Sequence, residues 1–215
     1  MDIARARPVD DRIGDPVMEQ RRRWLMAALL LFTAGGCATG PATVEEGTRR
    51  LGRNSVAYEG PELEAVVRTW QAQRDIAEER LILVVHLRGA HTSGITEIHR
   101  RDISVRTPDG RRLPVVTQTE FREVYAEIHS RVRRAMSSSA PLSTYRDDLR
   151  PCDRWFLVLP MDGFAQDEIA ISTFEECWGP LVFMVPGGVQ PGRWRLVIEL
   201  EESRADIPFE LELER

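Results

Sequence analysis

Three of the four histidines in this chain fall close together, and their side chains are the first candidates for a chemical site. His86, His91 and His99 lie within a stretch of 14 residues, and His129 follows farther along. Imidazole nitrogens bind zinc and related ions, so one strand histidine and two loop histidines could form a ligand set. The stretch HLRGAHTSGITEIH has no i, i+2 or i, i+4 histidine pair, however, and neither a cysteine nor a carboxylate motif accompanies it. We therefore predict no metal and no other cofactor, and interpret His86 as a partly buried strand residue.

Motifs of nucleophilic and nucleotide chemistry are absent from the sequence. The serines in TSG (92–94) and SSS (137–139) do not lie in the Gly-x-Ser-x-Gly elbow of hydrolases. The glycine-rich stretch PGGVQPG (186–192) lacks the lysine and the following helix of a phosphate-binding loop, and it is typical of a turn. The acidic residues fall mostly on predicted solvent faces, so no catalytic carboxylate pair can be selected. The sequence thus predicts a protein that is not an enzyme and has no catalytic residues.

The stretch RRRWLMAALLLFTAGGC predicts an export signal. Three arginines are followed by the short apolar run Trp24–Phe32 and by the small residues Ala34, Gly35 and Gly36. From Trp24 to Gly36 the segment has only 13 residues, whereas a membrane-spanning helix needs about 20. Met18 would begin a leader of ordinary proportions, so we interpret residues 1–17 as a mis-assigned start or an unusually long n-region.

The end of this leader, TAGGC, resembles a bacterial lipobox, in which small residues precede a cysteine that becomes lipidated and N-terminal. Ala34 departs from the pattern, because the third position before the cysteine is usually Leu or a similar aliphatic residue. The chain is similar in layout to small lipid-anchored bacterial proteins that consist of a signal peptide, a tether and a β-sandwich. This resemblance implies lipidation at Cys37. Ala38, in place of aspartate, implies the outer membrane; plain secretion and an uncleaved anchor are the alternatives.

The other two cysteines then form the natural pair. In an exported domain Cys152 and Cys177 are free to form a disulfide. Closing a loop of this length stabilises the fold by roughly 3–4 kcal/mol in the chain-entropy model. Two unpaired buried thiols are the alternative.

Composition and charge are those of an ordinary folded domain. The 215 residues are 42% apolar and 29% charged, with a net charge of −5. The length suits one domain plus a processed leader, and the negative charge excludes the basic footprint of a nucleic-acid-binding protein.

Most of the chain after residue 54 reads as strands. The stretch RLILVVHLRG (80–89) predicts a central strand, DISVRTPDGRRLPVVT (102–117) a hairpin, and RWFLVLP (154–160) and LVFMVP (181–186) two buried strands. Alternating apolar and polar residues predict two half-buried C-terminal strands, and Pro208 marks the last one as an edge. The segment from Glu62 to Trp70 is spaced for either a helix or a strand, and we favour a strand because its neighbours need a partner.

One segment is clearly helical. Apolar residues from Phe121 to Ala135 follow i, i+3, i+4 spacing, and Thr117 and Glu120 have the spacing of a capping box. Its arginines at 131–134 are interpreted as a solvated helix end, with anionic lipid or peptidoglycan carboxylates as the alternative contacts. Among the tryptophans, Trp155 and Trp194 are assigned to the core, and Trp178 is expected to cover the disulfide.

These observations predict a mainly β protein, an antiparallel β-sandwich of immunoglobulin-like or related form, with one inserted helix at about 118–136. Residues 1–36 are the signal peptide, 37–54 the lipidated cysteine and a flexible tether, and 55–215 the sandwich. We predict a non-enzymatic, lipid-anchored cell-envelope protein on the periplasmic side of the outer membrane. Its expected partners are the membrane, through the lipid, and another envelope protein. The alternatives are an envelope hydrolase and a periplasmic metal-binding protein that uses His86, His91 and His99.

Overall fold

The apolar stretch from Arg80 to Gly89 forms the centre of a six-stranded sheet. The computed structural model describes residues 47–91, 93–139, 149–160 and 162–213, which all belong to the compact unit Val44–Arg215. The strand order is β1-β2-β3-β4-β10-β8, and every pair is antiparallel except β10 with β8. These strands are β1 (Thr48–Arg50), β2 (Ser55–Glu59), β3 (Leu63–Arg68), β4 (Arg80–Gly89), β10 (Glu175–Met184) and β8 (Arg150–Pro151).

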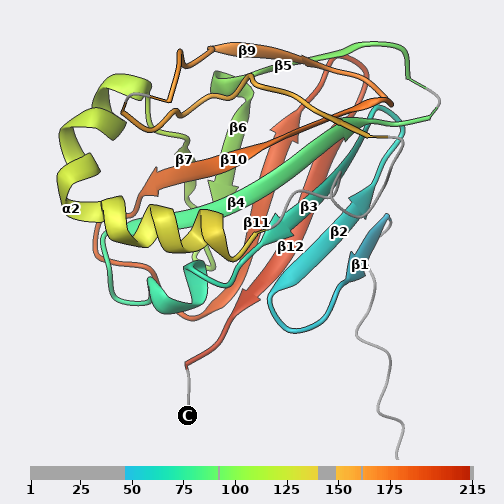
Figure 1. Ribbon diagram of the computed structural model, residues 1–215. Helices are drawn as coiled ribbons and strands as arrows, with labels where there is room; N and C mark the ends of the chain where they lie inside the picture. The colour runs from blue at the N-terminus through green and yellow to red at the C-terminus, as the bar shows by residue number, and fades with distance from the viewer. Residues whose placement is uncertain (1–46, 92, 140–148, 161, 214–215) are drawn as a thin grey trace, which may run out of the picture. The chain divides into compact units, whose positions relative to one another are not determined.

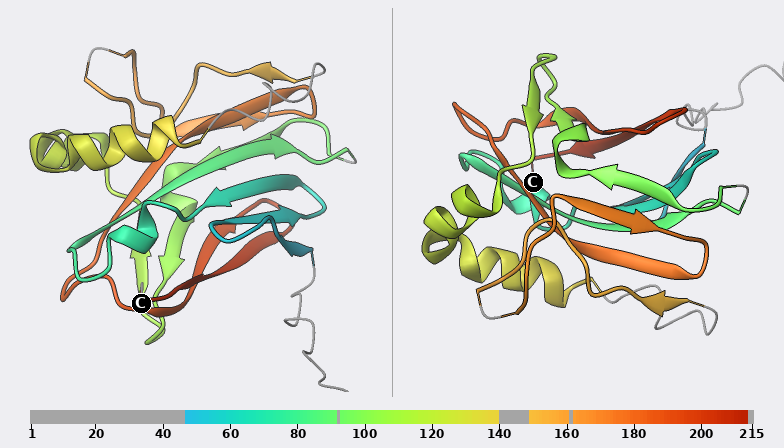
Figure 2. Two further views of the ribbon diagram at one scale, coloured as in Figure 1. Left: turned by 60° about the horizontal axis from the view of Figure 1, so that its bottom comes forward. Right: turned by 90° about the horizontal axis from the view of Figure 1, so that it is seen from above.

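A four-stranded sheet of order β12-β11-β6-β7 packs behind the six-stranded sheet, as Figures 1 and 2 show. A two-stranded ribbon, β5 with β9, lies along the upper end of the molecule in Figure 1. These strands are β12 (Arg204–Leu211), β11 (Gly192–Glu199), β6 (Ile103–Arg106), β7 (Arg112–Pro114), β5 (Thr96–His99) and β9 (Glu168–Ile171). Two 3-10 turns, η1 (Ala72–Arg74) and η2 (Arg100–Asp102), complete the connections.

Both faces of β4 are buried, because different elements cover them. Leu81, Leu83, Val85 and Leu87 face the four-stranded sheet and are essentially inaccessible to solvent. The opposite face of β4 begins at Arg80 and is covered at that end by the helix α2 (Gln118–Ser137). Figure 1 shows the helix across the left half of the sheet, in front of β4 and β10, whereas β1 and β2 carry no helix. The part of this face that the helix does not reach holds the candidate site described below.

The helix forms where the sequence predicts it. Thr117 and Glu120 form the capping box, and Phe121, Ile128 and Val132 are fully buried on the inner side of the helix. Within the described residues α2 is the only α-helix. The prediction of a mainly β fold of antiparallel sheets with one inserted helix is therefore confirmed, and an immunoglobulin-like form is compatible with it.

A buried carboxylate fastens this helix to the sheet. Asp75, fully buried after η1, accepts hydrogen bonds from the Ile82 backbone amide (2.8 Å) and from Gln71 Nε2 (2.7 Å). Arg131 on α2 reaches the same carboxylate, with Nη2 2.8 Å from Asp75 Oδ1. Arg131 Nη2 also donates to the Arg80 carbonyl at 2.8 Å. One arginine thus joins the helix, η1 and the start of β4.

The folded unit begins earlier than predicted. Residues 48–50, which we had assigned to the tether, form β1 and pair with β2. The polar sequence of this segment gave no sign of a strand, because β1 is an edge strand on which Arg49 and Arg50 are exposed. The signal peptide, Cys37 and the rest of the tether lie outside the described residues. The strand preferred between Glu62 and Trp70 is present as β3.

The predicted strand at RWFLVLP is wrong, although its side chains are buried as expected. Trp155, Phe156 and Leu157 are in the core, but the backbone does not join a ladder. The side chain of Gln118 bonds both the amide and the carbonyl of Val158, and Trp155 Nε1 donates to the Pro180 carbonyl (2.8 Å). The segment therefore bonds its backbone partly to a side chain and partly to a loop, since the Trp155 carbonyl accepts from the Gln166 amide, and its indole contacts β10.

Gly179 makes this contact possible. It lies in the middle of β10, where glycine is unusual in a strand. A methyl group at this position would overlap the indole ring of Trp155. The absence of a side chain at Gly179 is what lets the Trp155 ring approach the strand so closely.

The C-terminal hairpin has the predicted arrangement. β11 and β12 pair along their whole length, and β12 is the edge strand that contains Pro208. Trp194 and Phe209, opposite one another in the register, stack in the core with ring centroids 6.5 Å apart.

Candidate functional site

The exposed end of the helix-side sheet face is hollowed by a cavity of about 250 Å³. Its floor and walls come from β1 to β4, from the start of β10 and from Leu149. The lining residues are Arg49, Leu51, Ala57, Tyr58, Glu59, Glu64, Ala65, Val66, His86, Leu87, Arg88, Leu149 and Glu176. Polar side chains of both charges therefore meet apolar ones in one partly open hollow.

A buried histidine–glutamate pair lies at the floor of this cavity. His86 Nδ1 is 2.7 Å from Glu176 Oε1, and both side chains are 1% exposed. The sheet register places them together, because His86 is opposite Trp178 and Glu176 is two residues before Trp178 on the same face. The Trp178 ring stacks on the imidazole, with centroids 5.4 Å apart and planes 10° apart. Strand pairing and ring stacking thus hold the imidazole in one orientation.

The second ring nitrogen of His86, Nε2, is buried and lacks a hydrogen-bond partner among the described residues. A carboxylate at Nδ1 fixes the ring orientation and directs the other nitrogen to a different partner. Buried polar atoms are rarely left unpaired, because each costs about 1–3 kcal/mol. This nitrogen is therefore a natural contact point for a ligand.

Arg88, two residues after His86 on the same face, shows the same feature. Its Nε donates to Glu64 Oε2 at 2.7 Å, and its Nη2 donates to the same oxygen. Its Nη1 is buried without a hydrogen-bond partner among the described residues. Two residues that line the cavity, at alternate positions on β4, thus each have a buried polar atom without a described partner.

The rim of the cavity contributes little to stability. Arg49 and Glu59 form an ion pair at 3.7 Å, and their side chains are 70% and 68% exposed. Exposed pairs of this kind are weak because water and salt screen them. The rim pair is therefore free to rearrange around a ligand.

The predicted disulfide is present. Cys152 and Cys177 are joined across a sequence separation of 25, which connects the segment after β8 to β10. Trp178 was expected to cover this bond, but it does not. Alternation along β10 turns its side chain to the opposite face of the sheet, where it stacks on His86.

The structure does not bring the three clustered histidines together. His86 binds Glu176, His99 Nδ1 lies 3.1 Å from Glu168 on the β5–β9 ribbon, and His91 is exposed. Among the described residues no group of three or more His, Cys, Asp or Glu side chains could hold a metal ion. The metal-binding alternative therefore has no geometric basis in this part of the chain.

Several residues of the site were missed from the sequence. The sequence analysis does not single out Glu176, Glu64 or Arg88 as residues of a site. The one available signal was that His86 and Arg88 share a face of the central strand. Arg131 was also misread, because it is a largely buried contact of Asp75 rather than part of a solvated helix end.

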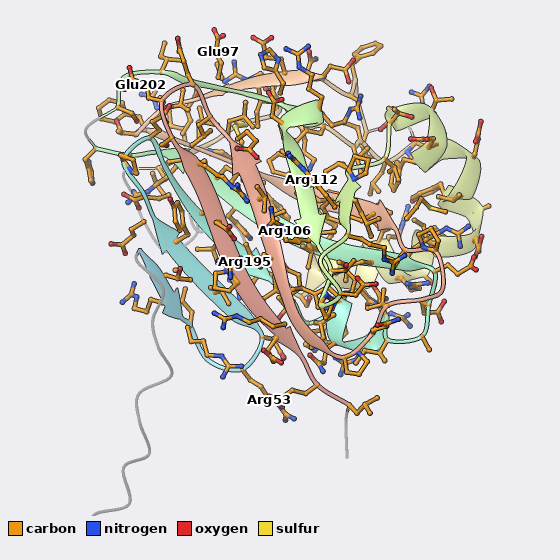
Figure 3. The ribbon with its side chains drawn as sticks, turned by 180° about the vertical axis from the view of Figure 1, so that it is seen from behind. Arg53, Glu97, Arg106, Arg112, Arg195 and Glu202 are labelled. Atoms are coloured by element: carbon orange, nitrogen blue, oxygen red, sulfur yellow. A yellow bond between two sulfur atoms is a disulfide. The ribbon has the colours of Figure 1, made fainter. Side chains whose placement is uncertain are left out.

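A row of arginines crosses the outer face of the four-stranded sheet. Arg112, Arg106 and Arg195 are direct neighbours on β7, β6 and β11, as Figure 3 shows. Like charges at directly opposite positions of a sheet repel one another, but acidic side chains on the same face offset this repulsion. Arg195 Nε donates to Asp206, and Arg112 Nη2 lies 3.4 Å from Glu199. We interpret this row as a largely neutralised solvent face.

Comparisons with known proteins give no relative. No family model, no curated protein and no solved structure matches the chain. Within the described residues no helix has the length and apolar character that a membrane crossing requires. The functional argument therefore depends on the site itself.

Proposed function

We propose that this protein is a lipid-anchored, non-enzymatic binding module of the bacterial cell envelope. The lipobox-like leader and Cys37 support attachment to the outer membrane on its periplasmic side, where the module would also meet an envelope protein partner. The Cys152–Cys177 disulfide supports an oxidising compartment, because such bonds persist outside the cytosol.

The observation that carries the binding function is the cavity on the helix-side sheet face. A purely structural sandwich would gain from filling this space with apolar side chains, because interiors are close-packed. The chain instead places the His86–Glu176 pair at its floor and leaves His86 Nε2 without a partner. A concave site with a few convergent polar groups is the usual form of a small-molecule pocket.

An envelope hydrolase is the second candidate, and the same pair favours it. A carboxylate-oriented imidazole with an open Nε2 resembles the base of a catalytic triad in geometry. No described serine, threonine or cysteine hydrogen-bonds to that nitrogen, however, so a nucleophile would have to be water. Ester or peptide turnover that disappears in His86→Gln would favour the hydrolase, whereas binding without turnover favours the module.

The anchor is tested by mass spectrometry of the protein extracted from membranes. We expect the mature chain to begin at Cys37 and to carry a diacylglyceryl group. The Cys37→Ser variant should lose the acyl mass and leave the membrane fraction. A wild-type protein that retains residues before Cys37, or that begins there without lipid, would contradict the anchor.

The binding function is tested by native mass spectrometry of the same preparation. We expect a small molecule that stays bound in the native protein and is released on denaturation. An Ala57→Trp variant, which fills the cavity from β2, should carry none. Equal retention in both proteins would place the ligand elsewhere and remove the support that the cavity gives to the proposal.

A further inference from the structure

We infer that the cavity takes a small monocarboxylate with an apolar body, held by Arg88 Nη1 and His86 Nε2. This inference rests on the proposed binding function and names its ligand class. It follows from the two unsatisfied atoms, from the charges around them and from the apolar part of the wall.

Arg88 provides the first contact. Its Nε and Nη2 are both committed to Glu64, so the guanidinium is fixed in place while Nη1 points its two N–H groups at no described acceptor. A guanidinium has five donors and no acceptor group. Nη1 therefore needs a hydrogen-bond acceptor, and a charged oxygen forms one of the stronger hydrogen bonds with it.

His86 provides the second contact. Residues two apart on a strand lie roughly 6–7 Å apart on the same face, so one small group can approach both side chains. Glu176 already occupies Nδ1, and Nε2 is the ring nitrogen that remains. Neutral His86 donates from Nδ1 to Glu176 and accepts at Nε2 from the hydroxyl of a carboxylic acid, whereas the doubly protonated ring donates from Nε2 to a carboxylate. One proton shared between ring and ligand therefore makes the contact in either arrangement.

The surrounding charges limit the ligand to a single negative charge. Three glutamates, two arginines and one histidine line the cavity, in the contacts Glu64–Arg88, Glu59–Arg49 and Glu176–His86. The cavity therefore has no excess of positive charge with which to hold a dianion such as phosphate. A monocarboxylate uses the open donors and brings the least additional repulsion.

The remaining wall suits a short apolar chain. Leu51, Ala57, Val66 and Leu149 line the same space. Each methylene buried against such side chains contributes about 0.8 kcal/mol, so affinity should rise with chain length until the cavity is full. A volume of about 250 Å³ limits the body to a small molecule.

Calorimetric titration of the full-length Cys37→Ser protein tests this inference with three probes of one shape: hexanoate, hexanamide and hexan-1-ol. We expect hexanoate to bind at least tenfold more tightly than either neutral probe. Arg88→Met should weaken hexanoate binding at least tenfold, and Arg88→Lys should restore only part of it, because lysine keeps the charge but not the fork.

Arg68→Met is the matched control. Arg68 lies on the same sheet face, is partly buried and also has an unpartnered Nε, but it does not line the cavity. This variant should bind hexanoate like the parent protein. Thermal unfolding of each variant shows whether it is folded. If Arg88→Met does not fold, the binding of hexanoate to Arg88→Lys tests the inference instead.

The outcomes separate the ligand class from the binding function. Equal binding of all three probes, or hexanoate binding that Arg88→Lys leaves unchanged, would overturn the carboxylate inference and leave the cavity as a site. Failure of hexanoate to bind would also overturn it, while the retained ligand seen by native mass spectrometry would still support the module. Loss of hexanoate binding in Arg88→Met with retention in Arg68→Met would support the inference.

Discussion

Replacing Arg131 by methionine is expected to lower the free energy of unfolding by about 3–5 kcal/mol, because it leaves the buried Asp75 carboxylate without its opposite charge. The arginine side chain is 13% exposed and the aspartate is fully buried, so water replaces little of the lost contact. Urea unfolding measured at neutral pH gives the difference directly. Arg133→Met, an exposed arginine on the same helix, is the control and should change stability by no more than about 0.5 kcal/mol.

The pH dependence of this effect has a definite sign. Burial raises the pKa of Asp75 above its ordinary value of 3.8, against the opposing effects of Gln71 and Arg131. A raised pKa means that the folded protein holds the proton more tightly than the unfolded one. Stability therefore falls as the pH rises from 3.8 through the folded pKa, and is level above it.

Loss of Arg131 removes a contact that lowers this pKa, so the Asp75 pKa rises further in the variant. The destabilisation should therefore be largest at neutral pH and should shrink in acid, where Asp75 is protonated in both proteins. In an Asp75→Asn background the same substitution should cost much less. An equal loss in both backgrounds would show that Arg131 acts through packing alone.

Removing the disulfide is expected to lower the free energy of unfolding by roughly 3–4 kcal/mol in the chain-entropy model for a loop of this length. The bridge spans 25 residues and joins Cys152 to the buried Cys177 at the start of β10. The Cys152→Ser/Cys177→Ser double variant, compared with the oxidised parent by urea unfolding, gives the value.

Cys37→Ser is the control for this comparison, because it removes a cysteine but leaves the bridge intact. It should unfold at the same urea concentration as the parent. A double variant as stable as the parent would mean that the unfolded chain is already compact around this loop, so that the bridge adds no constraint.

Much of the architecture could be predicted because periodicity reports burial. The helix from Gln118 to Ser137, the hairpin around Gly110 and the C-terminal strands all have one buried face, and their apolar residues repeat accordingly. The strand β1 could not be predicted in this way, since an exposed edge strand has no apolar face to repeat. The strand prediction for the RWFLVLP segment was wrong for the opposite reason. A buried segment without a strand partner has the same run of apolar residues as a buried strand.

The candidate site was less predictable, because register created it. Glu176 is separated from His86 by 90 residues in the chain, and only the antiparallel pairing of β4 with β10 brings them together. Nothing in the sequence around either residue indicates that contact. The cysteine pair, in contrast, followed from counting the cysteines of a chain that we predict to be exported, and that prediction did not depend on strand register.

The most direct test of the binding cavity is the nuclear magnetic resonance of its histidine. The chain has only four histidines, so single His→Gln variants can assign each imidazole signal. On addition of hexanoate to the Cys37→Ser protein, we expect the His86 signals to move while those of His91, His99 and His129 stay in place. A His86 signal that does not move at saturating hexanoate would contradict the assignment of this cavity as the ligand site.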